Sequence, residues 1–165
     1  MSNPLRVAFI ADIHHGEDNM TKRGSAALGL IDEFRRFVDQ TRPDLVIDLG
    51  DRISDKDHDT DLGLEREVAE ALRPIAQPLY HICGNHDREY LSVAENEEIL
   101  GQPLANEVVD LGEWRVVLWR ADSKIYRPGG LVLRESDLVW LANVVHNADR
   151  PLLITSHVPV SGHSQ

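Results

Sequence analysis

The stretch LYHICGNHD, residues 79–87, runs from a short apolar segment directly into a loop that carries an amide, an imidazole and a carboxylate. An apolar run of this length indicates a buried strand. A plain tight turn would favour Asn-Gly or Asp-Gly, and a charged, histidine-bearing loop has little packing reason to follow such a strand. Asn85, His86 and Asp87 are therefore candidates for a functional site at the end of a strand.

Four further short apolar runs share this arrangement, and each ends in a polar loop: residues 6–11, 44–49, 115–120 and 152–155. Apolar residues at helical spacing lie between them, over residues 27–38 before Pro43, over 64–75, and over 135–147 with Ser136 or a neighbour as cap. This alternation predicts an α/β fold. In such folds, ligand sites form at the carboxyl ends of the strands.

Length and composition favour one domain over residues 1–165. A chain of 165 residues, 42% of them hydrophobic, can bury one sizeable core. The single cysteine, Cys83, excludes a disulfide framework, and no apolar N-terminal run follows basic residues, so we expect a cytoplasmic protein. The apolar runs are far shorter than the roughly 20 residues that cross a bilayer, so we expect no membrane span.

The formal net charge of -11 disfavours broad contact with nucleic acid, because that contact requires clustered Lys and Arg. It does not exclude a phosphate substrate. Bound cations can reverse the local field of an acidic site, so a net-negative protein can still present a positive pocket to an anion.

Metal-type side chains follow three of the other apolar runs. Asp12 and His14 stand two residues apart, so that both side chains point the same way in an extended segment. Asp51 follows Gly50, and His157 follows the last run. Together with residues 84–87, four predicted strands deliver these groups to one edge, which predicts a metal site.

These blocks resemble those of the calcineurin-like metallophosphoesterase superfamily. The family pattern is D-x-H, then G-D, then G-N-H-D or G-N-H-E, then a lone His. The corresponding residues are Asp12-Ile13-His14, Gly50-Asp51, residues 84–87 and His157. The predicted helix with Leu138, Trp140 and Leu141 also resembles the branch that contains class III cyclic-nucleotide phosphodiesterases.

The resemblance implies a metallophosphoesterase-type β-sandwich flanked by helices, with two metal ions. Asp12 and His14 would bind one ion, Asn85 and His157 the other, and Asp51 would bridge both. It further implies metal-dependent hydrolysis of phosphate esters, phosphodiesters in particular, by a hydroxide that bridges the two ions. The substrate would be a small phosphorylated molecule.

The resemblance also implies catalytic roles for His86 and Asp87. His86 would face the phosphate as general acid or as a donor to the transition-state charge, and Asp87 would fix its ring. The mixed set of imidazole, carboxylate and amide ligands suits divalent or trivalent Mn, Fe or Zn better than calcium.

The chain departs from the family at its end. The family closes with G-H-x-H; here Gly162 and His163 match the first half, and Gln165 stands at the second histidine. His163 is either a ligand or a polar loop residue. We expect a fold that is incomplete at the C-terminus, lacks later strands, and associates with itself or with a separate C-terminal piece. A degenerate, non-catalytic relative that binds metal or a phosphorylated ligand is the alternative function, and a nuclease is disfavoured by the acidic charge.

Other polar residues favour structural roles. The acidic loop over residues 55–61 lacks the EF-hand pattern, since Leu62 and Val68 replace the required Gly and Glu, and reads as a solvated loop with a helix cap at the rim of the site. His15 and His81 are expected to be structural or to orient other groups. Core or strand-face positions are expected for the tryptophans, Trp114, Trp119 and Trp140.

Overall fold

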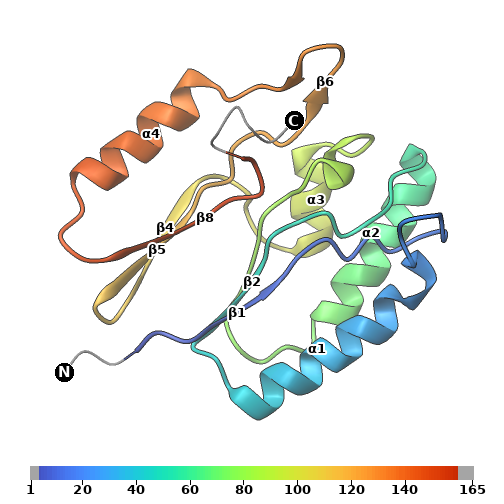
Figure 1. Ribbon diagram of the computed structural model, residues 1–165, viewed down its shortest axis with the longest axis horizontal. Helices are drawn as coiled ribbons and strands as arrows, with labels where there is room; N and C mark the ends of the chain where they lie inside the picture. Colours follow the sequence, from blue (N-terminus) through green and yellow to red (C-terminus); the bar gives the residue numbers. More distant parts are fainter. Residues whose placement is uncertain (1–3, 160–165) are drawn as a thin grey trace.

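Three parallel strands form the first sheet of the computed structural model, which describes residues 4–159 (Figure 1). The order is β1 (Val7–Ile10), β2 (Leu45–Asp48) and β3 (Leu79–His81). All residues of the central strand β2 are buried, because both of its edges and both of its faces are covered. These strands lie within the predicted runs.

The second sheet has the order β4 (Glu107–Leu111), β5 (Trp114–Leu118) and β8 (Leu152–Thr155). β5 and β8 were predicted and are parallel, whereas β4 was not predicted and is antiparallel to β5. The tight β4–β5 connection passes through Gly112, whose φ of +57° suits glycine. A short hairpin of β6 (Ile125–Tyr126) and β7 (Gly130–Leu131) follows.

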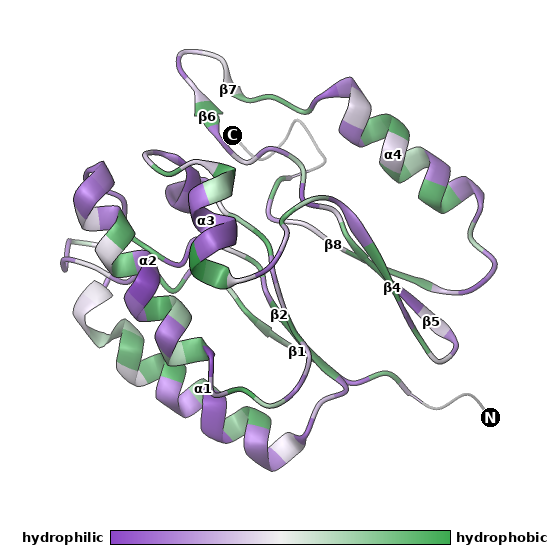
Figure 2. Ribbon diagram, turned by 180° about the vertical axis from the view of Figure 1, so that it is seen from behind, coloured by the Kyte–Doolittle hydropathy of each residue, from purple (hydrophilic) through white to green (hydrophobic). Residues whose placement is uncertain are grey.

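Helices cover the outer faces of both sheets (Figures 1 and 2). α1 (Ala27–Thr41) and α2 (His58–Leu72) pack on the first sheet, where Ile31 and Val68 meet Val46. α4 (Glu135–His146) packs on the second sheet through Trp140 and Val117, and α3 (Val93–Leu100) lies against α2. Two 3-10 turns, η1 (Gly24–Ala26) and η2 (His86–Arg88), complete the elements.

The two sheets pack face to face. Buried side chains from both sheets form one apolar layer: Leu45, Ile47, Ile82, Val116 and Leu118. The result is a four-layer arrangement of helices, sheet, sheet and helix. The predicted α/β fold with a helix-flanked β-sandwich is confirmed.

Helix boundaries differ from the prediction where capping decides them. α2 begins at His58 rather than residue 64, because the Asp57 carboxylate accepts the backbone N–H of Thr60 and caps a polar first turn. Of the predicted caps for α4, Ser136 or a neighbour, the structure has the neighbour: α4 begins at Glu135, after Arg134 in extended backbone and without a side-chain cap. α3 was not predicted, although Ser92 and Glu95 form a capping box.

Within residues 4–159, no helix combines the length and the apolar character needed to cross a membrane.

Candidate metal centre

The loops after β1 and β2 run side by side beyond the carboxyl ends of the strands. The backbone N–H of Asp12 donates to the carbonyl oxygen of Gly50 at 3.0 Å, and that of His14 donates to the carbonyl oxygen of Asp51 at 3.0 Å. These bonds extend the parallel pairing of β1 and β2 by a few residues. The predicted ligands Asp12, His14 and Asp51 are therefore brought to one edge of the first sheet.

Three predicted ligands adopt a left-handed backbone conformation. The φ angles of Asp12, His14 and Asp51 are +53°, +48° and +55°, and the only other non-glycine residue with positive φ between residues 4 and 159 is Arg42. This conformation costs a residue other than glycine on the order of 1–3 kcal/mol and persists where the surroundings enforce it. In this arrangement Nε2 of His14 lies 3.7 Å from the carboxylates of both Asp12 and Asp51.

Two glycines allow the loop after β2 to touch the loop after β3. A Cβ atom at Gly50 would overlap the backbone nitrogen of Gly84, and one at Gly84 would overlap the Asp51 carboxylate. Gly50 also has a φ of +96°. Gly50-Asp51 and Cys83-Gly84 therefore lie in close backbone contact, and neither glycine position tolerates a side chain.

The carboxylate of Asp51 faces two separate groups of side chains. Its Oδ2 lies 3.7 Å from Nε2 of His14 and 3.9 Å from Nε2 of His86. Its Oδ1 lies 3.6 Å from Nε2 of His157 and accepts the backbone N–H of His86 at 3.0 Å. One ligand atom from each of His14, Asp51 and His86 lies within 4.8 Å of the others. The geometry suits a carboxylate shared between two cations.

His157 and Asn85 meet on the Oδ1 side of Asp51. Nδ1 of His157 lies 2.9 Å from the carbonyl oxygen of Leu49, and since a carbonyl can only accept, this nitrogen carries the hydrogen. Nε2 of His157 then presents its lone pair, 3.3 Å from Oδ1 of Asn85. An imidazole nitrogen and an amide oxygen are both common metal ligands, so this pair fits a metal ion.

His14 and Asp12 form the other side of the centre. Nε2 of His14 lies 3.7 Å from Oδ1 of Asp12, whose side chain is 68% exposed at the rim. Burial, followed by the nearby Lys22 ammonium, lowers the pKa of His14 and favours the neutral ring that a metal requires. Imidazole, carboxylate and amide donors together fit Mn, Fe or Zn.

His86 is oriented by Asp55 and not, as predicted, by Asp87. Nδ1 of His86 contacts the Asp55 carboxylate, and the ring meets that of His14 edge to face with 4.7 Å between centroids. The Asp87 carboxylate points the other way, into the protein, where it accepts the backbone N–H groups of Asp51, Arg52 and Gly84 at 2.7 to 2.9 Å. The predicted role of Asp87 is corrected: it joins two ligand loops.

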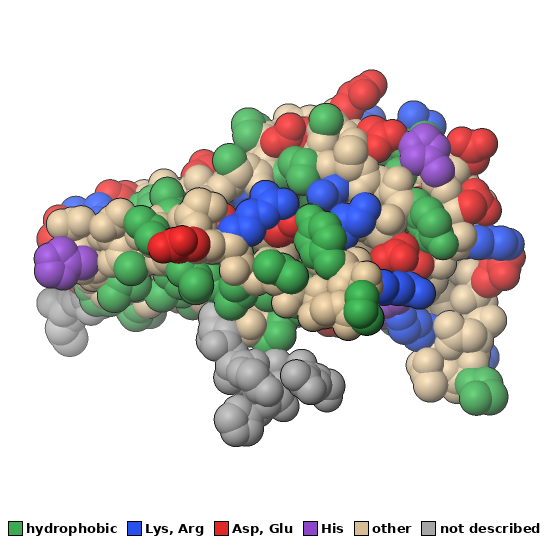
Figure 3. Space-filling view, turned by 90° about the horizontal axis from the view of Figure 1, so that it is seen from above, with side chains coloured by type: hydrophobic (Ala, Val, Ile, Leu, Met, Phe, Trp, Pro, Cys, Tyr) green, Lys and Arg blue, Asp and Glu red, His purple; other side chains and the backbone are tan. Residues whose placement is uncertain are grey.

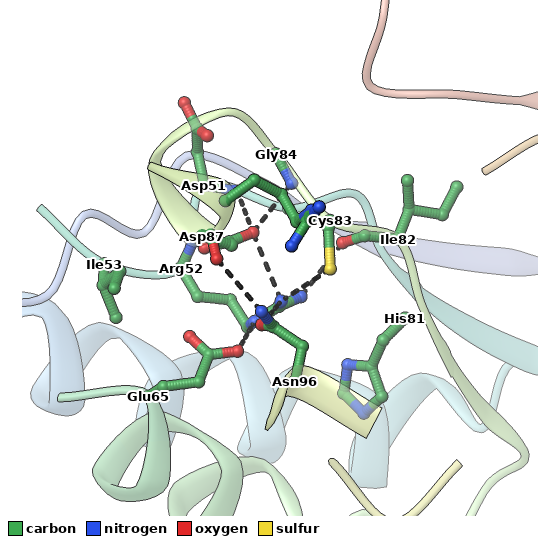
Figure 4. Close-up of polar contacts among 12 residues, drawn as sticks. Asp51, Arg52, Ile53, Glu65, His81, Ile82, Cys83, Gly84, Asp87 and Asn96 are labelled. Carbon is green, nitrogen blue, oxygen red and sulfur yellow. Dashed lines mark hydrogen bonds and ion pairs between the residues drawn. The ribbon is translucent and has the colours of Figure 1, made fainter. Parts of the chain in front are cut away.

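Arg52 completes this junction beneath the site (Figure 4). Its fully buried guanidinium contacts three acidic side chains, those of Asp48 at 2.7 Å, Glu65 at 2.5 Å and Asp87 at 3.2 Å. Arg52 therefore ties α2 and the end of β2 to the loops that present Asp51 and Asn85. The sequence analysis missed Arg52, although a charged residue directly after Gly50-Asp51 was the available signal.

Glu65 makes the stability of the fold depend on pH. Burial raises its pKa from 4.5 to about 8, against the attraction of Arg52 and with repulsion from Asp87 and Asp48. Between these two values the folded protein keeps a proton that the unfolded chain releases, so stability falls as pH rises. At ~1.4 kcal/mol per pKa unit, the loss between pH 5 and pH 8 is on the order of 4 kcal/mol.

We expect Glu65→Gln to remove this loss. The amide retains the acceptor for Arg52, and Oε2, which it replaces, has no hydrogen-bond partner within residues 4–159. Urea unfolding of both proteins at pH 5 and pH 8 is the measurement. An equal pH dependence in the two proteins would show that Glu65 is ionised in the fold.

Most of the remaining polar residues have the predicted roles. His15 bonds Glu67 at 2.6 Å and His81 bonds Asp48 at 2.8 Å, and both rings are buried. In the acidic loop, Asp57 caps α2, while Asp55 reaches the site rim through His86. Trp119 is fully buried. His163 and Gln165 lie outside the described residues.

Comparisons with known proteins agree with this arrangement. The model of the calcineurin-like phosphoesterase family matches residues 5–165. The chain is 35% identical over 127 residues to a 3',5'-cyclic adenosine monophosphate phosphodiesterase, CpdA, of Pseudomonas aeruginosa, over 74% of this chain and 42% of that protein. A dimetal phosphatase from Danio rerio has a similar structure, with a TM-score of 0.76 and 16% identity, over 95% of this chain and 70% of that one.

The chain therefore belongs to the calcineurin-like phosphoesterase family. It matches about two fifths of the length of the curated relative. The similarity to the Danio rerio protein, at 16% identity, extends to the fold.

Proposed function

We propose that this chain binds two metal ions and takes part in the hydrolysis of small phosphate esters, diesters in preference to monoesters. The observation that carries the proposal is the position of Asp51, whose Oδ2 faces His14 and His86 while its Oδ1 faces His157. A carboxylate between two groups of imidazoles suits a ligand shared by two ions. Membership of the calcineurin-like phosphoesterase family and the structural similarity to a dimetal phosphatase support the proposal of two metal ions.

Each ion has its own ligands in this proposal. Asp12 and His14 hold one, Asn85 and His157 hold the other, and Asp51 contacts both. When bound, a pair of such ions clamps a phosphate and lowers the pKa of a water. The carbonyl oxygen of Leu49 holds the hydrogen of His157 on Nδ1 and so directs Nε2 into the site.

His86 acts on the substrate in this proposal. Asp55 accepts the hydrogen on Nδ1, which leaves Nε2 directed toward the centre. A hydrogen on Nε2 can then be given to the leaving oxygen of the ester or shared with a charged phosphate oxygen. Nε2 lies within ligand distance of the same centre, so the metal content of a His86 variant separates this role from coordination.

The preference for small substrates rests on charge. The chain has a net charge of -11, and Lys and Arg side chains on the face in Figure 3 are interspersed with Asp and Glu. Extended nucleic acid would meet repulsion over such a surface. The relative from Pseudomonas aeruginosa is named for a small cyclic diester, which supports the diester preference.

The test compares bis(p-nitrophenyl) phosphate with p-nitrophenyl phosphate in the presence of Mn²⁺. We expect hydrolysis that depends on added metal and favours the diester. Mn²⁺ binding with no turnover of either ester would instead identify a non-catalytic metal-binding relative. Elemental analysis of the purified protein would identify the native metal among Mn, Fe and Zn.

A further inference from the structure

A cavity of about 190 Å³ lies between the loop after β3, the loop after β5 and the starts of α3 and α4. Its described lining includes three arginines, Arg88, Arg120 and Arg134, and no proposed metal ligand. Pockets for molecules of drug size usually measure about 300–1,000 Å³. The cavity therefore suits a small ion or a single chemical group rather than a whole nucleotide.

Arg120 is buried in the wall of this cavity, with a side chain only 3% exposed. Its Nε donates to the carbonyl oxygen of His81 at 2.8 Å. Its Nη1 donates to the carbonyl oxygen of Ala105 at 2.7 Å and to the Glu107 carboxylate at 3.0 Å. Nη2 is buried and has no hydrogen-bond partner within residues 4–159. Because a buried donor without an acceptor is unfavourable, this nitrogen needs an acceptor that residues 4–159 do not supply.

Arg88 brings a second guanidinium to the cavity. Its Nη1 donates to the carbonyl oxygen of Leu91 at 2.6 Å, which holds the side chain across the turn between η2 and α3. The acceptor in this contact is a neutral carbonyl rather than a carboxylate. The contact therefore orients Arg88 and leaves its positive charge available to an anion.

The carboxylates that line the cavity already have partners. Asp122 accepts a hydrogen bond from Nη2 of Arg134 at 2.5 Å, and Asp137 accepts one from the side-chain amide of Asn106 at 3.1 Å. Among the described lining side chains, three guanidinium groups face these two carboxylates. The lining thus has an excess of positive charge and of hydrogen-bond donors, which favours an anion.

The cavity also adjoins the loop that carries two residues of the candidate metal centre. Cys83 and Arg88, which both line the cavity, flank residues 84–87. The hydroxyl group of Ser123, another lining residue, donates to the carbonyl oxygen of Gly84 at 2.9 Å. An anion that holds Arg88 in place would therefore restrain this loop from its C-terminal end.

We propose that the cavity binds a phosphate group, either as inorganic phosphate or at the end of a small ester, between Arg88, Arg120 and Arg134. Guanidinium groups bind phosphate through paired, charge-assisted hydrogen bonds. A phosphate oxygen would supply the acceptor that Nη2 of Arg120 needs. This binding site is separate from the two proposed metal ions and does not depend on them.

The experiment measures the binding of inorganic phosphate and of phenyl phosphate by calorimetry, with EDTA present so that neither compound contacts a metal ion. The proteins are the wild type, Arg88→Met, Arg134→Met and Arg127→Met. Arg127 pairs with Glu89, is 81% exposed and does not line the cavity, so its variant controls for the loss of one positive charge. We expect Arg88→Met and Arg134→Met to bind on the order of tenfold more weakly and Arg127→Met to match the wild type.

The two compounds distinguish the two sources of the phosphate group. Tighter binding of inorganic phosphate would identify the free ion as the ligand, and tighter binding of phenyl phosphate would identify an ester. In ¹H–¹⁵N spectra of the wild type, the ligand should shift the amide signals of Cys83, Ala121 and Ser123.

Three results would overturn the inference: no binding of either compound to the wild type, equal binding by all four proteins, or an equal loss in Arg127→Met. If Arg88→Met does not fold, Arg134→Met decides the test, since the Arg134 side chain is 59% exposed.

Discussion

Asp51→Asn is expected to remove both metal ions and to reduce turnover of a phosphodiester by more than about 10³, since each ion loses an anionic ligand and the charge that holds the pair together. The fold should persist. Asparagine tolerates positive φ as well as aspartate does, and its side-chain oxygen can still accept the backbone N–H of His86. Elemental analysis per chain after dialysis is the measurement.

The matched control is Asp12→Asn. Asp12 also has positive φ, but its carboxylate lies near His14 alone among the predicted ligands and is mostly exposed. We expect this variant to lose one ion and keep the other. If Asp51→Asn instead retains the parental number of ions, Asp51 does not bridge them.

His86→Ala is expected to retain the metal ions and to lower turnover by roughly 10² to 10⁴, the usual contribution of a positioned proton donor. The backbone N–H of residue 86 still donates to Asp51 in this variant, so the shared carboxylate keeps its orientation. Steady-state rates and metal content must be measured on the same preparation. Loss of metal would place His86 among the ligands, and unchanged turnover would remove it from the chemistry.

Asp55→Asn is the companion to that variant. The Asp55 side chain contacts Nδ1 of His86, which is not a predicted metal ligand, so metal content should stay at the wild-type level. Asparagine can still accept a hydrogen bond but carries no charge, so the loss of turnover should be smaller than for His86→Ala. A larger loss would mean that Asp55 itself acts on the substrate.

The sequence predicts the fold wherever the regular spacing of hydrophobic residues determines the secondary structure. The five predicted strands and three predicted helices exist because each packs apolar residues against the core in a regular pattern. β4 and α3 were missed for different reasons. Glu107–Leu111 is only half-buried at a sheet edge, and α3 is a short helix whose start depends on the capping box at Ser92 rather than on an apolar face.

The candidate site could be predicted from the sequence only where its residues are of the types that commonly bind metal. Asp12, His14, Asp51, Asn85 and His157 could be found because metal-type side chains follow strands, and the structure brings them together. The contacts of Asp55 and Lys22 could not, because each reaches the site through a side-chain direction that no periodic pattern encodes. The same reason explains the wrong role given to Asp87, which turns inward to backbone donors. For Arg52 the available signal was its charge directly after Gly50-Asp51.

The left-handed backbone at Asp12, His14 and Asp51 has a consequence for divergent members of the family. Each position lowers the stability of the fold, and under the proposed function an ion bound by the three side chains would offset that cost. A descendant that no longer needs metal would gain stability from glycine at these positions. Glycine at these positions would therefore identify a member of the family that no longer binds metal ions, even where its strands and helices are unchanged.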